Sequence, residues 1–383
     1  MAIISSQRHL FDIPDDVAYF NCSYNSPMLN SACDVLVKGA QEKLHPWQRT
    51  PANFFDDAQA MRTAAASALG GNAECYAVVP SASYGMSTAA RILENHVGAG
   101  NEIIVLDEAF PSNYLPWHRL AETTGARLVV VPTPDDLNWT KAVIDHITDN
   151  TAVVAIPHCH WTNGARLNLV QISDETRTAG AALALDLTQS LGAMPFDFDQ
   201  VKPDFVAAAT YKWLLGPYGI SLFYVDERWH NARPLEETWL GRKGAEQFEN
   251  LVNYSHTYQP GARRFDMGQK NIPTLVPGSV VSLNQIARWG VKNIAETLAK
   301  TNTAIADGLS GTPLVALPQT VRSPHILGAT AKAELPDHLL PALAEQKIFI
   351  SRRGSSLRFA PHLHVSENDI DRLVSTVKTV FNC

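Results

Sequence analysis

Residues 182–219 read ALALDLTQSLGAMPFDFDQVKPDFVAAATYKWLLGPYG, and they place two charged side chains directly after two apolar runs. The run ALALD (182–186) ends in Asp186, and the run FVAAAT (205–210) is followed by Lys212. Short apolar runs of this kind predict buried β-strands. Because an unpaired buried charge is unfavourable, we expect Asp186 and Lys212 to find partners where these strands end.

The same pattern extends outward along the chain. Five further apolar runs predict strands, at 76–80, 102–107, 127–132, 152–157 and 220–225. Helix-like segments separate several of them, and strands that are apolar throughout imply a sheet covered on both faces. We therefore predict an α/β fold with a mainly parallel, seven-stranded sheet between helices, and ligands at the carboxyl ends of its strands.

The pattern changes after about residue 275. The chain there contains a long helical stretch, short strands and a last helix, at 279–309, around 325–330, 349–354 and 357–361, and at 367–381. These elements predict a smaller α/β domain. We predict a large domain at 15–272 and a small domain made of residues 1–14 and 273–383.

Composition excludes several classes of protein. Of the 383 residues, 45% are hydrophobic and 18% are charged, which is typical of a globular enzyme or binding protein with a large core. The formal charge of −7 comes without a basic stripe, so nucleic acid is not expected as a partner. No apolar run reaches the roughly 18 residues of a membrane span. Five scattered cysteines without CxxC spacing favour reduced thiols in the cytoplasm and no zinc site.

Lys212 and Asp186 together could bind pyridoxal 5′-phosphate (PLP). The lysine would form a Schiff base with the aldehyde, and the aspartate would keep the pyridine nitrogen protonated. A helix cap is the ordinary alternative for Asp186. The segment SASYGMSTA (81–89) follows a strand and starts a helix, where free N–H groups attract phosphate. A plain serine-capped helix would look the same.

Other candidates follow other strands. Phe110 could lie flat on a cofactor ring, or it could be an ordinary core residue. Arg358, in the apolar strand LRFAP, could hold a substrate carboxylate or form a structural ion pair. His158 and His160 lack a third ligand at a suitable spacing, so we expect pocket-lining residues there and no metal.

The order and spacing of these motifs resemble the class V aminotransferase superfamily of fold-type I PLP-dependent enzymes. Residues 182–219 resemble that family's strand–Asp-x-x-Gln … Lys-Trp … Gly-Pro-x-Gly signature, and the likeness extends over nearly the whole chain. It implies a fold-type I domain, PLP as cofactor, and a homodimer with active sites near the subunit interface. The likeness is to the cysteine C–S lyase, isopenicillin N epimerase-like and kynureninase branches.

The resemblance also implies roles for single residues. Lys212 would carry the cofactor as an aldimine and then move the Cα proton of an amino-acid substrate. Asp186 would pair with the pyridinium, and Gln189 would donate to the phenolic oxygen of the ring. Phe110 would stack on the ring. The phosphate would be bound by Ala82, Ser83 and Tyr211.

Substrate binding is implied in the same way. Arg358 falls on the family's carboxylate-binding arginine. The segment HCHWTNG, with His160 and Trp161, resembles the His-x-x-Trp-Asn-Thr-Gly of cysteine C–S lyases, although Thr162 and Asn163 are transposed. Asn25 and its neighbour Tyr24 would return to the substrate pocket, or they would only pack against the domain.

The chain departs from the family in places that bear on its reaction. Desulfurases carry a nucleophilic cysteine on a loop that is missing here, because Arg353-Gly354 is followed almost at once by Arg358. The Gly-Thr that reaches a neighbouring subunit's phosphate is Gly268-Gln269. We therefore expect a lyase that eliminates the sulfur substituent of a cysteine derivative. The alternatives are a class V aminotransferase, an amino-acid epimerase, or a scaffold that kept the fold without catalysis.

Overall fold

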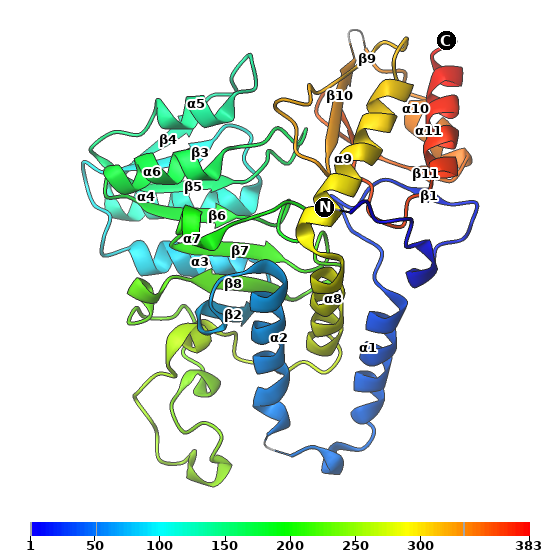
Figure 1. Ribbon diagram of the computed structural model, residues 1–383. Coiled ribbons are helices and arrows are strands. Elements are labelled where there is room, and N and C mark those ends of the chain that lie inside the picture. The colour runs from blue at the N-terminus through cyan, green and yellow to red at the C-terminus, as the bar shows by residue number, and fades with distance from the viewer. Residues whose placement is uncertain (1, 51, 332–333) are drawn as a thin grey trace.

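A seven-stranded sheet forms the centre of the protein (Figure 1). The structure is a computed structural model that describes residues 2–50, 52–331 and 334–383. The strand order is β2-β8-β7-β6-β5-β3-β4; β8 pairs antiparallel with β2 and β7, and the other pairs of this sheet are parallel. The strands are β2 (Tyr76–Val79), β3 (Glu102–Leu106), β4 (Arg127–Val131), β5 (Thr151–Pro157), β6 (Ala182–Asp186), β7 (Phe205–Ala209) and β8 (Ser221–Val225). The predicted fold class is confirmed.

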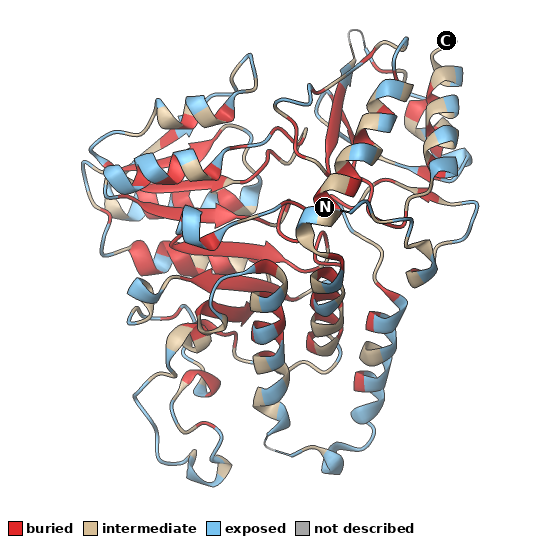
Figure 2. Cartoon of the chain, viewed as in Figure 1, coloured by how far each residue is buried: buried red, intermediate tan, exposed pale blue. Residues whose placement is uncertain are grey.

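Alternate residues of these strands enter two separate hydrophobic cores. In β5, Val153 packs into the core on the side of α3 and α4, whereas Val154 packs into the core on the side of α2, α6 and α8. Successive side chains point to opposite faces of a strand, so strands covered on both sides must be apolar throughout. Figure 2 shows the sheet as the buried centre of the molecule. The helices named so far are α2 (Asn53–Leu69), α3 (Ala82–Leu93), α4 (Leu115–Thr124), α6 (Leu169–Thr178) and α8 (Val276–Trp289).

The later part of the chain forms a second sheet, with strand order β12-β13-β10-β9 and antiparallel pairing throughout. A short parallel pair joins β1 to β11, so residues near the N-terminus lie beside the C-terminal elements (Figure 1). The strands are β1 (Ala18–Tyr19), β9 (Leu314–Ala316), β10 (Leu327–Ala331), β11 (Ile348–Phe349), β12 (Ser351–Arg353) and β13 (Ser356–Phe359). The remaining helices are α1 (Asn30–Glu42), α5 (Trp139–Ile144), α7 (Phe198–Val201), α9 (Val291–Gly308), α10 (Leu339–Glu345) and α11 (Glu367–Val380).

The division into domains at residues 15 and 273 stays a prediction. In the structure α8 packs along α1 and α2, on the side of the large sheet, although we placed its residues in the small domain. The long helical stretch expected at 279–309 is two helices, which is a correction. Gly290 has a φ of +76°, a conformation that suits glycine, and it ends α8 before α9 begins at Val291.

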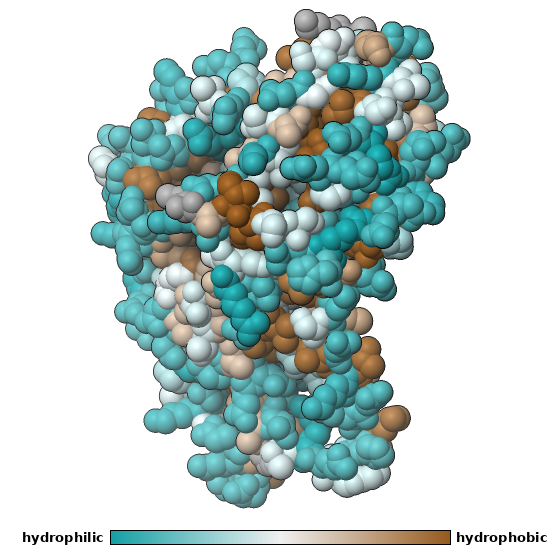
Figure 3. Space-filling view, turned by 45° about the vertical axis from the view of Figure 1, so that its right-hand side comes forward, coloured by the Kyte–Doolittle hydropathy of each residue, from teal (hydrophilic) through white to brown (hydrophobic). Residues whose placement is uncertain are grey.

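Hydrophilic side chains cover most of the face drawn in Figure 3, with hydrophobic ones scattered among them. This is the ordinary distribution for a folded surface. In the three described stretches of the chain, no helix combines the length and apolarity that crossing a membrane requires.

A buried cluster of three charged side chains, Arg62, Asp266 and Lys270, links the edge strand β2 to the segment that contains Asp266 and Lys270. Asp266 accepts hydrogen bonds from the backbone N–H of Val78 at 2.9 Å, from Lys270 Nζ at 2.7 Å and from the Arg62 guanidinium. Burial alone would raise the pKa of Asp266, but the two cations outweigh burial and hold that pKa below its usual value. The carboxylate is therefore ionised at neutral pH and neutralises two cations that lie in the core.

We expect Asp266→Asn to lower the free energy of unfolding by about 3–5 kcal/mol, because it leaves Arg62 and Lys270 buried without their counter-charge. Urea unfolding followed by circular dichroism at neutral pH measures this change. The matched control is Asp135→Asn, which removes the same charge from an exposed position and should stay within about 0.5 kcal/mol of the wild type. Equal stability of the two variants would contradict a structural role for the cluster.

Candidate active site

A closed loop between β7 and β8 holds Lys212 at the carboxyl edge of the large sheet. Thr210 Oγ1 donates to the carbonyls of Pro217 and Ile220, both at 2.8 Å, and the Gly216 N–H donates to the Thr210 carbonyl at 2.9 Å. A Cβ on Gly216 would lie 2.8 Å from Thr210 Cβ, so only glycine fits this close approach. The loop therefore fixes the backbone from which the lysine side chain projects.

A cavity of about 240 Å³ opens beside this loop, where the parallel strands end. Its lining includes residues that follow β2, β3, β5, β6 and β7. The structure brings together these predicted site residues: Ala82, Ser83, Phe110, His160, Trp161, Asp186, Gln189, Tyr211 and Lys212. Arg358 and Asn25 do not line the cavity.

Lys212 is almost completely buried in the cavity wall. Burial lowers the pKa of its amine to about 8, while the Asp186 carboxylate acts in the opposite direction. The amine lies 5.4 Å from the ring centroid of Phe110 and 5.5 Å from that of Tyr211, and it has no hydrogen-bond partner within the described parts of the chain. Far more of the neutral, nucleophilic amine is therefore available near neutral pH than for an exposed lysine.

Asp186 ends β6 and faces the same cavity. Burial raises the pKa of its carboxyl group, whereas hydrogen bonds from Thr188, including its backbone N–H at 3.0 Å, and the charge of Lys212 lower it. A protonated nitrogen in the cavity would stabilise the ionised carboxylate. This acceptor suits a pyridinium.

Hydrogen bonds fix the side chain of Gln189. Its Oε1 accepts from Trp213 Nε1 at 3.1 Å, and its Nε2 donates to the Ser23 carbonyl at 2.9 Å. The second hydrogen on Nε2 remains available to a ligand. The amide is therefore held in one orientation at the cavity wall.

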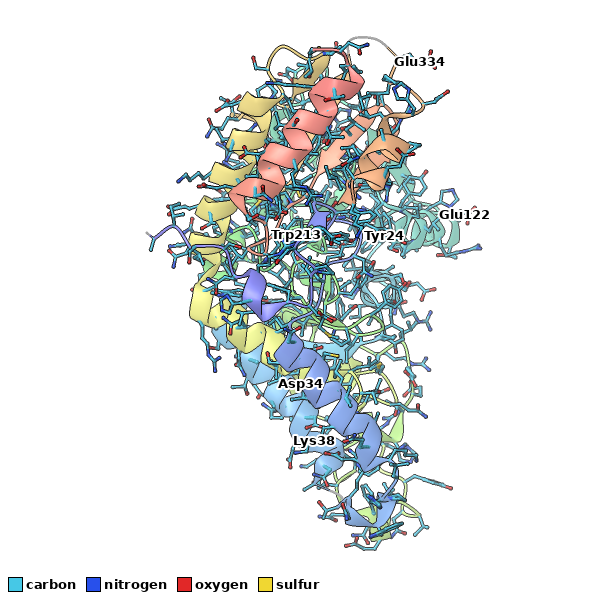
Figure 4. All side chains as sticks on the ribbon, turned by 90° about the vertical axis from the view of Figure 1, so that its right-hand side faces the viewer. Tyr24, Asp34, Lys38, Glu122, Trp213 and Glu334 are labelled. Carbon is cyan, nitrogen blue, oxygen red and sulfur yellow. The ribbon has the colours of Figure 1, made fainter. Side chains whose placement is uncertain are left out.

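The N-terminal segment closes over the lysine loop through its backbone and Ser26. Ser26 Oγ donates to the Lys212 carbonyl at 2.5 Å. Figure 4 shows Tyr24 and Trp213 at mid-height, below α11 and above α1. Asn25 is exposed, and its carbonyl accepts from Tyr19 OH at 2.5 Å. The pocket role predicted for Asn25 stays untested, and its side chain lies outside the cavity.

His160 and Trp161 form one side of the cavity. His160 stacks on Trp139 at 5.1 Å, and its Nε2 donates to the Asp107 carbonyl at 3.2 Å, which leaves Nδ1 to accept from the Thr162 hydroxyl. Burial lowers the pKa of His160, so the ring is neutral and both nitrogens are engaged. His160 therefore forms a fixed part of the cavity wall.

Arg358 lies behind that wall. It is buried in β13, and its Nη1 donates to the Trp161 carbonyl at 2.6 Å while its Nε donates to Ser351 Oγ at 3.2 Å. Burial lowers the pKa of its guanidinium to about 9, and the charge of Arg353 acts in the same direction. Arg358 thus contacts the cavity wall from the four-stranded sheet without lining the cavity.

Sequence reasoning missed several lining residues, among them Asn113 and Thr188. Asn113 Oδ1 accepts from Trp117 Nε1 at 3.0 Å, but its buried Nδ2 has no partner among the described residues. Thr188 Oγ1 accepts from the Ala209 N–H at 3.2 Å. Asn113 lies in the segment FPSNY (110–114), and Thr188 lies in the segment DLTQ (186–189). The sequence of such a segment does not show which of its side chains faces a cavity.

The donors and acceptors of this cavity fit PLP. Ser81 caps α3, accepting from the Tyr84 N–H at 3.1 Å, and its hydroxyl lies 2.8 Å from that of Ser83. The unpaired N–H groups of that first turn suit a phosphate. At the sheet edge, Lys212 offers an amine with a lowered pKa, and Asp186 offers a buried acceptor. The unpaired Nδ2 of Asn113 is the free donor that a bound ligand would satisfy.

Comparison with known proteins identifies the family. The family model for class-V aminotransferases matches residues 48–372, and the chain belongs to this family of PLP-dependent enzymes. The chain is 24% identical to an uncharacterized aminotransferase, YcbU, of Bacillus subtilis over 82% of this chain and 80% of that protein. It is 27% identical to a probable cysteine desulfurase of Pyrococcus abyssi over 57% of this chain and 53% of that protein.

Solved structures share the fold at low sequence identity. The cystine C–S lyase C-DES, in complex with its product cysteine persulfide, superposes with a TM-score of 0.85 at 18% identity, over 95% of this chain and 97% of that one. The cysteine desulfurase CsdA of Escherichia coli gives a TM-score of 0.82 at 19% identity, over 98% of this chain and 97% of that one. At such identities the likeness establishes the fold alone.

The lowered pKa of Lys212 predicts how the apoprotein takes up PLP. Only the neutral amine attacks the aldehyde, so the initial rate of covalent attachment should rise about tenfold per pH unit below about 8 and level off above it. The rate is followed by borohydride reduction at timed intervals and mass spectrometry of the intact chain. A rate that keeps rising to the pKa of an ordinary lysine would contradict the burial effect.

The Lys212→Ala variant should retain no reducible PLP under the same treatment, because Lys212 is the one lysine in the cavity lining among the residues that the structure describes. Wild-type protein treated in parallel is the control. Stoichiometric labelling of the variant would show that another amine carries the cofactor.

Proposed function

We propose that this protein cleaves a C–S bond of a cysteine derivative by β-elimination, with PLP held by Lys212. The observation that carries the proposal is a cavity with a reactive amine and no reactive thiol. Cys159 is the one cysteine in the lining. Burial raises the pKa of its thiol to about 12, so it stays protonated and is a poor nucleophile.

When bound, PLP withdraws electrons from the substrate Cα. The residues of the chain would supply binding and proton transfer. Lys212, whose lowered pKa leaves part of its amine neutral near physiological pH, would accept the Cα proton, and Asp186 would hold the proton on the ring nitrogen. Arg358 would hold the substrate carboxylate from the small domain. The aromatic walls Phe110 and Trp161 would exclude water from the reacting bond.

The β12–β13 hairpin supports elimination without transfer of sulfur to the protein. Arg353 pairs with Ser356, so the turn between the strands contains only Gly354 and Ser355. No cysteine lies in this turn, whereas several relatives bear the name cysteine desulfurase. The sulfur substituent would therefore leave as a free thiol, and the remaining 2-aminoacrylate would hydrolyse to pyruvate and ammonia.

A homodimer in the cytoplasm is part of the same proposal. It rests on the resemblance to fold-type I enzymes and on five cysteines without paired spacing. Light scattering of the purified protein measures the oligomeric state.

The test is incubation of the PLP-loaded enzyme with S-ethylcysteine and no added 2-oxo acid. Pyruvate should form in amounts equal to the thiol released, because both products come from one elimination. The Lys212→Ala variant is the control for the amine. Product formation that strictly requires a 2-oxo acid would indicate transamination, and exchange of the Cα proton without pyruvate would indicate epimerisation. Either result would contradict the proposal.

A further inference from the structure

The small-domain sheet presents two arginines on the face that meets the cavity. In the β12–β13 pair, Ser351 lies opposite Arg358 and Arg353 lies opposite Ser356. Side chains two residues apart on a strand share a face, so Arg353, Ser351 and Arg358 project to the same side. Arg353 and Arg358 are therefore diagonal neighbours across the strand pair.

Both arginines reach the same tryptophan of the cavity wall. Arg358 Nη1 donates to the Trp161 carbonyl at 2.6 Å, and the Arg353 guanidinium carbon lies 5.9 Å from the centroid of the Trp161 ring. Trp161 in turn lies edge-on to Phe110, with ring centroids 5.3 Å apart, and the Phe110 ring faces the Lys212 amine. A continuous series of contacts thus runs from Arg353 to the reacting amine.

These positive charges lack a protein counter-charge. In the part of the chain that the structure describes, neither guanidinium has a carboxylate oxygen within 4.0 Å. Arg353 donates instead to the Arg352 carbonyl at 2.7 Å. Glu108, whose carbonyl accepts from Trp161 Nε1, is exposed and pairs with neither. Like charges on neighbouring strands are unfavourable unless an anion lies between them.

One substrate carboxylate does not balance this site. Burial is the largest cause of the lowered pKa of Lys212, and the charges of Arg358 and Arg353 lower it further, against the single opposing carboxylate of Asp186. Asp186 is the expected partner of the ring nitrogen, so it is not available to the arginines. The cofactor phosphate, which we assign to the start of α3 on the large domain, is not their partner either. A second anionic group on the substrate would balance this charge.

We propose that the substrate carries two anionic groups, with its α-carboxylate on Arg358 and a second carboxylate, on the sulfur substituent, on Arg353. The inference rests on the proposed C–S lyase function and names its substrate class. The substrates are cysteine conjugates whose leaving thiol bears an acid group. Arg353 is partly exposed, and its guanidinium lies against the ring of Trp161, which lines the cavity, so it could meet the distal end of such a substituent.

The first test compares two substrates of nearly equal shape. S-carboxymethylcysteine has the second carboxylate, and S-carbamoylmethylcysteine has a neutral amide in its place. We expect kcat/KM for pyruvate formation to favour the acid by about five- to tenfold at low ionic strength, and the preference to fall as salt is added. Arg353→Gln should remove the preference by slowing the acid alone.

Arg352→Gln is the matched control for charge and position in the chain. Arg352 lies next to Arg353 but on the opposite face of β12, exposed and bonded through Nε to the Gly354 carbonyl. This variant should keep the preference for the acid. Loss of the preference in both variants would show a general effect of net charge and would overturn the assignment of Arg353.

The second test measures binding without the reaction. (Carboxymethylthio)propanoate, which lacks the amino group, and its neutral amide at the carboxymethyl end are titrated into the PLP-loaded enzyme by calorimetry. The diacid should bind about five- to tenfold more tightly to wild type and to Arg352→Gln, but equally to Arg353→Gln. Equal affinity for wild type would overturn the inference.

The two tests separate the inference from the proposed function. A diacid preference in binding without any pyruvate would support the anion site and contradict the lyase. Pyruvate from both conjugates at equal rates, with equal binding of the two analogues, would support the lyase and overturn the anion site.

Discussion

The structure depends on one constraint, which is that an amine and a carboxylate must share a buried cavity at the edge of a sheet. Asp186 ends β6 and Lys212 follows the neighbouring strand β7, and burial raises the pKa of the carboxyl group and lowers that of the amine. Such a pair is unfavourable as plain structure, because desolvation opposes both charges. It becomes useful when a ligand reacts with the amine and gives the carboxylate a proton to hold.

The surrounding elements serve to keep that cavity in one shape. The Thr210 hydroxyl closes the loop that carries the lysine, and the N-terminal segment bonds to Gln189 and to the Lys212 carbonyl. From the small domain, His325 Nε2 contacts the Gln189 carbonyl. Residues from three distant parts of the chain therefore position one wall.

Charge is distributed unequally around the cavity. The start of α3 offers N–H groups and hydroxyls, while the opposite wall faces two arginines that lack carboxylate partners among the described residues. In a cavity with low-dielectric walls, such an arrangement favours anionic ligands at both ends and orients an amino acid between them. The same positive charges help to keep Lys212 neutral. The arginine charges thus add to burial, which is the main cause of the lowered pKa of the amine.

The sequence alone determined the strands of the large sheet, the family resemblance and the cofactor, because these depend on local apolar runs and on motifs that follow them. Tertiary structure decided what faces the cavity. It placed Asn113 and Thr188 in the lining, put Asn25 outside it, and set Arg353 beside Arg358 on one face of a hairpin. It also broke the expected long helix at Gly290. The reason is physical: apolar periodicity is a property of neighbouring residues, whereas the direction of a side chain toward a shared cavity depends on packing between segments far apart in the chain.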